Sequence, residues 1–331
     1  MSFITVTKTQ TGQIYVDRDR CLEWLSVGDY GKENNLKANF LGLDKPICGV
    51  HHKTVHLSDK WVITISTQKG CRCSCDFCDV PKVGYAGNVS IEDFRYMICE
   101  ALRRENCQHT KRLNVHFARM GEPTFNDDVL YFTSDHLDSI VNSLISADTI
   151  HPVVSTMLPN NNPFLVRFLL NWCKLKNERN GEAGLQFSIQ STDKKQRETQ
   201  FKGHSLDLCS IANVANKLPF PKGRKYTLNF AVTKDTILDA KYLSGLFDKD
   251  KWLVKITPIH KTATANANNY DVTTEYNSYD VYAKFEQPLV NEGWDVIVFV
   301  PSKEEDTGRI TCGNALLADL TTLSSSVGYS E

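Results

Sequence analysis

Three cysteines in the segment 70–78, Gly-Cys-Arg-Cys-Ser-Cys-Asp-Phe-Cys, have the spacing of an iron–sulfur ligand set. Cys71, Cys75 and Cys78 form the pattern C-x3-C-x2-C, with a phenylalanine directly before the last cysteine. A 4Fe–4S cluster normally takes four protein thiolates, so three leave one iron with an open coordination position. An open metal position binds a small ligand, as it does in catalytic metal sites. The spacing therefore predicts a 4Fe–4S cluster that holds a small chelating molecule.

Other uses of these cysteines fit the sequence less well. Four cysteines within the eight residues 71–78 are too crowded to pair well as disulfides, and no secretory context is present. A zinc site usually combines two C-x2-C pairs or adds histidines, and the sequence has no second C-x2-C pair. Cys73 lies outside the predicted spacing and is expected to be a bystander or a thiol near the site. Cys48, with His51 and His52, forms an incomplete metal-ligand set, for which a structural or surface role is expected.

Composition limits the class of protein and its partners. The chain has 331 residues, enough for one large domain or for one domain with an appendage. No apolar run approaches the roughly 20 residues that span a membrane, and the N-terminus lacks the profile of a signal peptide. Eleven cysteines without such a signal predict reduced thiols and a cytoplasmic protein. A net charge of −1 gives no overall attraction for nucleic acid, so any such contact would need a local patch, at 222–225 or 103–104.

From residue 61 onward, short β-branched runs alternate with helical patterns. Strands are expected at 61–67, 113–118, 152–156, 185–189, 226–232, 252–257 and 296–300. Helices are expected from a capping box at Ser90 to residue 104, and at 126–146, 163–176, 206–217, 237–247 and 276–292. This alternation predicts an α/β fold with a parallel sheet, here a partial (β/α)6 barrel.

The same pattern divides the chain into three parts. Residues 1–60, with short strand-like runs at 3–7 and 13–16, are expected to form a small N-terminal appendage. Residues 61–301 are expected to form the barrel and residues 302–331 a C-terminal segment that carries Cys312.

Residues with chemical potential fall at equivalent places along these units. Cys71, Glu122, Ser155, Ser188 and His260 all lie at or just past the end of a predicted strand. Chemistry in α/β barrels takes place at the C-terminal ends of the strands. These residues are therefore expected to share one site.

The loop Met120-Gly121-Glu122-Pro123 has properties that suit ligand binding. Gly121 allows the backbone to approach a ligand closely, and Pro123 stiffens the turn. Glu122 offers a carboxylate that accepts charge-assisted hydrogen bonds from an ammonium group. A surface turn is the alternative for so short a motif.

Four stretches of the chain resemble the RlmN/Cfr family of radical S-adenosylmethionine (SAM) adenosine methyltransferases. They are Ser-Thr-Gln-Lys-Gly-Cys at 66–71, Met-Gly-Glu-Pro at 120–123, Val-Ser-Thr at 154–156 and Cys-Gly-Asn at 312–314, with weaker similarity at 187–190 and 256–260. They cover about residues 61–316, whereas residues 1–60 show no convincing match to the family's N-terminal RNA-binding region. The resemblance implies that the open iron binds SAM and that an electron from the cluster cleaves SAM to a 5′-deoxyadenosyl radical. It also implies a nucleic acid or nucleotide substrate and an electron donor such as flavodoxin or ferredoxin.

The resemblance assigns roles to individual residues. The SAM-binding residues that it implies are Gly121, Glu122, Ser155, Ser188, Gln190 and His260. Glu122 would accept hydrogen bonds from the SAM ammonium group, and Ser155 and Ser188 would contact the ribose or methionine part. At His260 the family has an asparagine that contacts the adenosine part, and a histidine there also offers an acid or a base near neutral pH.

Two positions decide which reaction the resemblance implies. Cys312 matches the cysteine that accepts a methyl group from one SAM and is later activated by the radical; a buried structural cysteine is the alternative. The family has a second essential cysteine seven residues before the first cluster ligand, where this chain has Thr64. Because threonine cannot form a thiolate, either Cys48 or Cys73 takes over that task or the reaction differs.

The sequence therefore favours a radical-SAM enzyme that modifies a nucleobase, with adenine methylation through Cys312 as the leading hypothesis. The alternative is an isomerase or other non-methylating radical chemistry on a modified nucleotide, nucleoside or peptide. A non-enzymatic binding module stabilised by zinc or a cluster is a third hypothesis.

Overall fold

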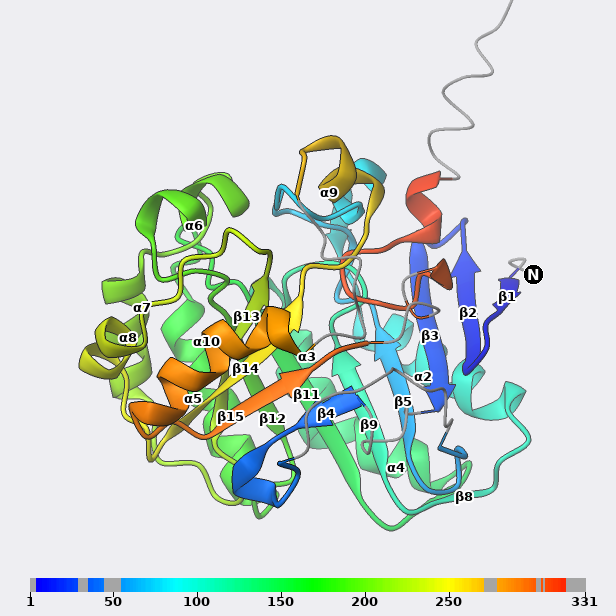
Figure 1. The fold of residues 1–331 in the computed structure, drawn as a ribbon. Helices are drawn as coiled ribbons and strands as arrows, with labels where there is room; N and C mark the ends of the chain where they lie inside the picture. The colour runs from blue at the N-terminus through cyan, green and yellow to red at the C-terminus, as the bar shows by residue number, and fades with distance from the viewer. Residues whose placement is uncertain are drawn as a thin grey trace, which may run out of the picture.

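The centre of the fold is one curved sheet, which has eleven strands in the described part of the chain (Figure 1). The structure, a computed structural model, describes residues 4–28, 35–44, 55–270, 279–301, 305 and 307–319. The strands of this sheet are β1 (Ile4–Lys8), β2 (Gly12–Asp17), β3 (Leu22–Gly28), β4 (Leu36–Lys37), β5 (Trp61–Ile65), β9 (Leu113–Phe117), β11 (Ile150–Thr156), β12 (Gly184–Ser188), β13 (Tyr226–Val232), β14 (Trp252–Pro258) and β15 (Val296–Phe299). Their order is β1-β2-β3-β5-β9-β11-β12-β13-β14-β15-β4.

The central part of this sheet is parallel. The strands from β5 to β15 pair in parallel with their neighbours, whereas β1, β2 and β3 at one edge and β4 at the other pair in the antiparallel direction. The predicted α/β fold with a mostly parallel sheet is confirmed. The N-terminal strands extend this sheet, because β3 is hydrogen-bonded to β5.

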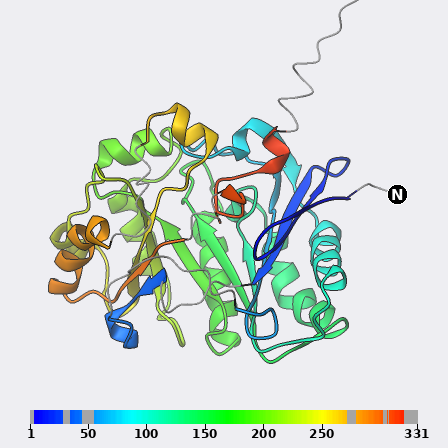
Figure 2. The same cartoon turned by 45° about the vertical axis from the view of Figure 1, so that its right-hand side comes forward.

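Helices form a layer on the outer side of the sheet (Figures 1 and 2). They are α2 (Ile91–Arg104), α3 (Asp128–Tyr131), α4 (Leu137–Asn142), α5 (Leu165–Glu178), α7 (Leu208–Lys217), α8 (Ala240–Leu246) and α10 (Asp280–Asn291). Two shorter helices, α6 (Lys194–Gln200) and α9 (Ala263–Ala267), lie near the end of the sheet where the parallel strands finish. Short strands β6 (Gln68–Gly70) and β7 (Tyr85–Asn88) pair with each other beside them, and β8 (His109–Thr110) pairs with β10 (Ser146–Ala147).

Alternation along the strands separates an apolar outer face from a more polar inner face. On β9, Leu113, Val115 and Phe117 are fully buried in the main hydrophobic core with the helices. Side chains alternate between the two faces of a strand, so Asn114 and His116 point to the inner side. The inner face is therefore where polar chemistry can be placed.

The helix predicted at 126–146 is confirmed over residues 128–142, but its middle is a π-helical turn and its predicted last residue lies in a short strand. The chain forms α3, a π-helical turn at Phe132–His136 and then α4, and Ser146 belongs to β10. Thr133 Oγ1 donates to Val129 O at 2.7 Å, a side-chain bond that competes with the regular helical pattern. Cys48, His51 and His52 lie outside the described residues. Within the described part of the chain, no helix is both long and apolar enough to cross a membrane.

Candidate iron–sulfur and SAM site

The cysteine loop connects β6 to a short 3-10 helix at Val80–Val83. Cys71 N donates to Gly84 O at 3.0 Å, and Cys78 N donates to Cys75 O at 3.2 Å, so backbone hydrogen bonds fix both ends of the ligand triplet. Cys71, Cys75 and Cys78 are half-buried free thiols. The loop thus holds the three predicted ligands in one turn of chain at the end of the parallel strands.

The three thiols influence one another electrostatically. Burial raises the pKa of Cys75 and of Cys78, and the negative charge that Cys71 carries as a thiolate raises both further. A hydrogen bond with the Cys73 thiol lowers the pKa of Cys71, which also accepts from Cys73 N at 3.3 Å. Thiolates are the ligand form of cysteine, and neighbouring thiolates that repel one another are stabilised by a cationic iron centre.

Three cysteine thiolates from one loop are the donor type that a 4Fe–4S cluster takes. Among the described residues, no three His, Cys, Asp or Glu side chains converge as the ligands of one metal ion. In a 4Fe–4S cluster each thiolate binds a different iron, so the ligands surround a cluster instead of meeting at one point. The thiol chemistry and the single loop therefore fit the predicted cofactor.

Cys73 is more buried than the other cysteines of the loop. It is 5% exposed and belongs to a small apolar cluster with Met157 and Phe201. Its Sγ lies 3.9 Å from Met157 Sδ. Burial in this cluster gives Cys73 a packing role.

The 120–123 loop lies directly beside the cysteine loop, and Gln68 joins the two. Gln68 Oε1 accepts from Arg72 N at 3.2 Å and from Glu122 N at 3.1 Å. Gly121 has φ +95°, and a Cβ at this position would lie 2.5 Å from the Gln68 side chain. Only glycine fits both the backbone angle and the contact.

Glu122 is a buried carboxyl group with several donors around it. Its Oε1 accepts from Thr124 Oγ1 at 2.7 Å, and its Oε2 accepts from Met157 N at 2.9 Å. Burial raises the pKa of Glu122, and these hydrogen bonds act in the opposite direction. The charge of this carboxylate also acts on the Cys71 and Cys75 thiols. Glu122 therefore lies within electrostatic reach of the cysteine loop.

The remaining predicted SAM-binding residues lie at the same end of the sheet. Ser155 is the second-last residue of β11, Ser188 is the last residue of β12, and His260 lies two residues after the end of β14. Gln190 has φ +67°, and its amide oxygen accepts from Ala231 N at 2.7 Å. That bond ties the loop after β12 to β13.

The segment that carries Cys312 returns to the cysteine loop from the other end of the chain. Gly313 O accepts from Asp79 N at 2.8 Å and lies 3.7 Å from Cys78 Sγ. Cys312 is exposed, yet the surrounding protein raises the pKa of its thiol by partial burial, while the positive charges of Arg119 and Lys255 lower it. Cys312 in turn acts electrostatically on Cys75 and Cys78.

Asp79 organises this junction. It accepts from Lys82 Nζ at 2.7 Å and from Thr264 N and Oγ1 at 2.9 and 2.6 Å, and it lies 3.6 Å from Arg309 NH2. Burial acts to raise the pKa of Asp79, but the hydrogen bonds from Lys82 and Thr264 lower it overall. One carboxylate thus joins the cysteine loop, α9 and the C-terminal segment.

A buried ion pair also anchors the C-terminal segment that carries Cys312. Glu23 of β3 is 0% exposed and pairs with Arg119, whose NH2 also donates to Arg309 O at 3.0 Å. Glu23 accepts from the backbone N–H groups of Leu316 and Leu317 at 3.1 and 2.8 Å, at the start of a helical turn at 316–319. The N-terminal sheet edge therefore anchors the C-terminal segment.

The position of the missing cysteine has a histidine beside it. Thr64 and His116 are register partners on β5 and β9, and both are half-buried on the inner face. Burial lowers the pKa of His116 to about 3, and the charges of Lys60 and Lys255 act in the same direction. The imidazole is consequently neutral near physiological pH.

Sequence reasoning did not identify Glu23, Arg119, Asp79 or His116. Asp79 directly follows the last cysteine of the motif, and Arg119 directly precedes the Met-Gly-Glu-Pro loop, so position was a usable signal for both. Glu23 is the one charged residue in the mostly apolar run Leu22–Val27, where a lone carboxylate indicates a buried pair.

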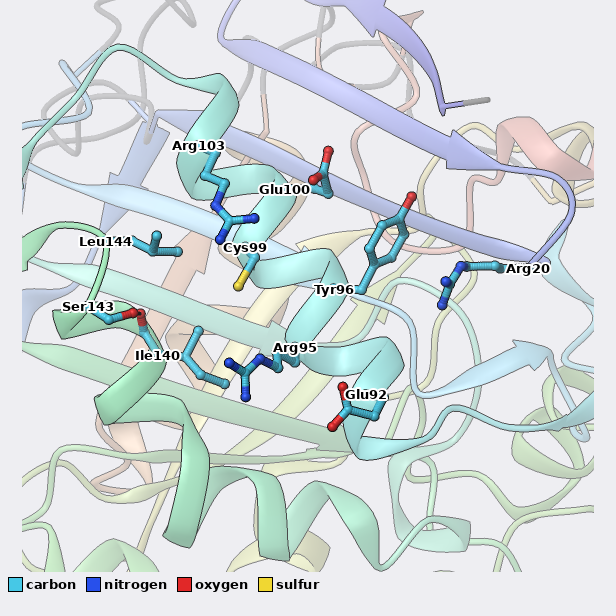
Figure 3. Close-up of a pocket in the computed structure, with 10 residues that line it drawn as sticks. All are labelled: Arg20, Glu92, Arg95, Tyr96, Cys99, Glu100, Arg103, Ile140, Ser143 and Leu144. Atoms are coloured by element: carbon cyan, nitrogen blue, oxygen red, sulfur yellow. Dashed lines mark hydrogen bonds between the residues drawn. The ribbon is translucent and has the colours of Figure 1, made fainter. Parts of the chain in front are cut away.

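A surface hollow of about 350 Å³ lies over α2, on the outer layer (Figure 3). It is lined by Arg20, Glu92, Arg95, Tyr96, Cys99, Glu100, Arg103, Ile140, Ser143 and Leu144. Arg103 belongs to the basic patch predicted at 103–104, but Glu92 and Glu100 alternate with the arginines on the same helix. This mixed charge is typical of a solvated helix surface.

Comparison with known proteins supports a relationship to RNA methyltransferases. No protein-family model matches the chain. The dual-specificity RNA methyltransferase RlmN of Nautilia profundicola is 25% identical over 242 residues, which are 71% of this chain and 62% of that protein. RlmN of Aliarcobacter butzleri is 34% identical over 71 residues, 22% of this chain and 20% of the relative. A probable RNA methyltransferase of Rhodopirellula baltica is 23% identical over 187 residues, 56% of this chain and 46% of the relative.

The chain thus covers about three fifths or less of the length of these relatives. Among solved structures, a radical SAM methyltransferase from Sphaerobacter thermophilus matches with a TM-score of 0.61 and 16% identity, over 96% of this chain and 82% of that chain. The fold is therefore shared with a radical-SAM protein. The resemblance first seen in the motifs is confirmed: the chain is related to the RlmN/Cfr-like radical-SAM proteins.

Proposed function

We propose that this chain is a radical-SAM enzyme that methylates a nucleobase, with Cys312 as the carrier of the methyl group. The main support is that the Cys312 segment contacts the cysteine loop, through the 2.8 Å hydrogen bond from Asp79 N to Gly313 O. Two segments more than 200 residues apart in the sequence thereby meet at the ends of the parallel strands. The sequence similarity to RNA methyltransferases supports the same function.

The residues of this site divide the work of holding the cofactors. Cys71, Cys75 and Cys78 would bind a 4Fe–4S cluster, and Glu122 would accept hydrogen bonds from the ammonium group of SAM. Bound there, the cluster and SAM would supply radical chemistry, with the electron coming from a donor such as flavodoxin or ferredoxin. Gly121, beside Glu122, has a positive φ, and because it lacks a Cβ the Gln68 side chain can lie close to it.

Cys312 must lose its proton before its sulfur can take up a methyl group. Partial burial opposes this loss, whereas the positive charges of Arg119 and Lys255 favour the thiolate. Arg119 is itself fixed by Glu23. The segment therefore places Cys312 next to positive charge at the mouth of the site.

The experiment compares three proteins after anaerobic reconstitution with iron and sulfide: the wild type, Cys312→Ser and Cys209→Ser. Cys209 is another exposed free thiol and serves as the matched control. Each is incubated with SAM, dithionite and an adenine-containing RNA, and mass spectrometry measures methyl groups on the protein and on the RNA. We expect a SAM-derived methyl group on Cys312 and on the RNA in the wild type and in Cys209→Ser, and on neither in Cys312→Ser.

A wild type that never carries a methyl group on Cys312 contradicts the proposal. Formation of 5′-deoxyadenosine without S-adenosylhomocysteine would point instead to the non-methylating radical chemistry that Thr64 first suggested.

A further inference from the structure

The inner face of the sheet carries a row of three polar side chains from adjacent strands. Ser188 of β12 is the register partner of Asn229 of β13, which in turn is the partner of Lys255 of β14. Leu228 and Val254, their sequence neighbours, are fully buried in the core with the outer helices. Side chains alternate along a strand, so Ser188, Asn229 and Lys255 point inward together.

Asn229 has an unused acceptor. The residue is 8% exposed, and no hydrogen-bond donor among the described residues reaches its buried Oδ1. A buried amide oxygen without a donor is unfavourable and calls for a specific explanation. The sheet does not need this group, because the backbone oxygen of Asn229 already accepts from Ile189 N at 2.8 Å.

Gln186, on the same face of the neighbouring strand, has a hydrogen-bond partner of the kind that Asn229 Oδ1 lacks. Gln186 of β12 donates to Ser155 Oγ at 3.3 Å, so its amide has a partner within the protein. Asn229 Oδ1 has none in the described chain, although it lies on the adjacent strand. A ligand in the interior would supply the missing donor.

Lys255 adds a positive donor next to Asn229. Its Nζ lies 5.2 Å from the centre of the Phe299 ring, on the strand that follows. Its charge lowers the pKa of Cys312 at the mouth and of His116 across the inner face. The row therefore lies within electrostatic reach of the methyl carrier.

We propose that Asn229 and Lys255 bind the edge of the base that the enzyme modifies, and that this base has an exocyclic amino group beside a ring nitrogen. Asn229 Oδ1 accepts a hydrogen bond from the amino group, and Lys255 donates one to the ring nitrogen. Adenine and cytosine both have this edge. Hypoxanthine and uracil present a carbonyl oxygen instead of the amino group, which would face Asn229 Oδ1 without a shared proton. The assignment rests on the proposed function, because it assumes a base as substrate.

The test measures binding instead of turnover. Short oligouridine RNAs with one central adenosine, cytidine, inosine or uridine are titrated onto the reconstituted protein with SAM present, and fluorescence anisotropy gives each Kd. The common backbone makes the phosphate contribution equal for all four probes. We expect the adenosine or the cytidine probe, or both, to bind about tenfold more tightly than the inosine and uridine probes, the effect of one buried hydrogen bond.

Three variants locate the source of this preference. Asn229→Leu is close in size and removes the unpaired oxygen, so the protein should still fold. It should bind the probes with and without the amino group about equally. Lys255→Met should weaken the amino-bearing probes about tenfold. Cys209→Ser, at an exposed thiol on the outer helix α7, should leave the preference unchanged.

Equal binding of all four probes by the wild type, or a preference that survives in Asn229→Leu, would overturn the assignment. Methyl transfer to Cys312 is assayed separately. A protein that prefers the amino-bearing probes but never methylates Cys312 would retain the binding assignment and lose the proposed function. A protein that methylates Cys312 without any base preference would do the reverse.

Discussion

At the scale of single residues, the cysteine loop separates thiols by their surroundings. Cys71, Cys75 and Cys78 remain half-buried, whereas Cys73 is enclosed by Met157 and Phe201. A ligand to a bound cluster must keep its sulfur accessible, and a packing cysteine need not. The spacing of the motif and the burial of its members therefore point to the same three ligands.

This distinction predicts the iron content of single variants. Cys71→Ser should lose most of its iron and sulfide on reconstitution, because serine does not supply a soft thiolate ligand. Cys73→Ser should keep both, with only a modest loss of stability from a polar group in an apolar cluster. Iron and sulfide per chain, with the visible absorption of the cluster, are the measurements. A Cys73→Ser protein as poor in iron as Cys71→Ser would make Cys73 a ligand.

His116 predicts a specific dependence of stability on pH. Its pKa in the folded chain is about 3, below the value of about 6.5 expected when unfolded. Below pH 6.5 the unfolded chain therefore binds a proton that the folded chain does not, and stability falls as the pH falls from about 6.5 towards 3. The slope from this residue is at most about 1.4 kcal/mol per pH unit.

The measurement is the free energy of unfolding in urea between pH 7.5 and 5 for the wild type and His116→Gln. His151, whose pKa burial lowers to about 4, contributes equally in both proteins. The variant should show a shallower slope. Parallel slopes in the two proteins would show that the pKa of His116 is about the same in the folded and unfolded chains.

At the scale of elements, the alternating strands and helices could be predicted from the sequence, whereas a strand buried on both faces could not. The parallel strands were found within a few residues because β-branched runs and helical patterns alternate, and β13 was predicted at Tyr226–Val232 as observed. β3 was not predicted, because all its residues are buried and no alternation remains to be read. α6 and α9 are too short for a helical period to be recognised.

The candidate site shows the same limit. Its motif residues could be predicted because each follows a strand, and parallel strands end at one edge of the sheet. Asn229 and Lys255 could not, since their significance comes from register between strands that are distant in the sequence. An isolated asparagine or lysine in a strand gives no such signal.

The loop after β9 predicts a sharp effect of one methyl group. Gly121→Ala would place a Cβ 2.5 Å from the Gln68 side chain at a φ of +95°. Gly203→Ala is the matched control, because φ is +71° and nothing lies within 4 Å of the new Cβ. We expect a loss of about 1 kcal/mol for Gly203→Ala and about 2–4 kcal/mol for Gly121→Ala, from strain and overpacking together. Urea unfolding measures both; equal losses would mean that Gln68 moves aside freely.

At the scale of the whole molecule, strand β3 near the N-terminus contacts the segment that carries Cys312. Figure 2 shows the C-terminal segment lying over the sheet beside the N-terminal strands. Glu23 from β3 caps the helical turn at 316–319 and neutralises Arg119 at the end of β9. The strands of residues 4–28 therefore contribute to the position of Cys312, although they show no motif of their own.

This arrangement predicts strong coupling between Glu23 and Arg119. Glu23→Gln leaves the Arg119 guanidinium buried without a charge partner, and Arg119→Met leaves the Glu23 carboxylate likewise, so each should cost about 3–5 kcal/mol in the free energy of unfolding. The double variant removes both charges together and should cost clearly less than the two single losses combined. In Glu23→Gln the turn at 316–319 also loses its charged cap, so iodoacetamide should modify Cys312 faster than in the wild type, with the rate at Cys209 as the internal control. Additive losses and an unchanged rate at Cys312 would show that the ion pair stabilises the sheet alone and does not position the methyl carrier.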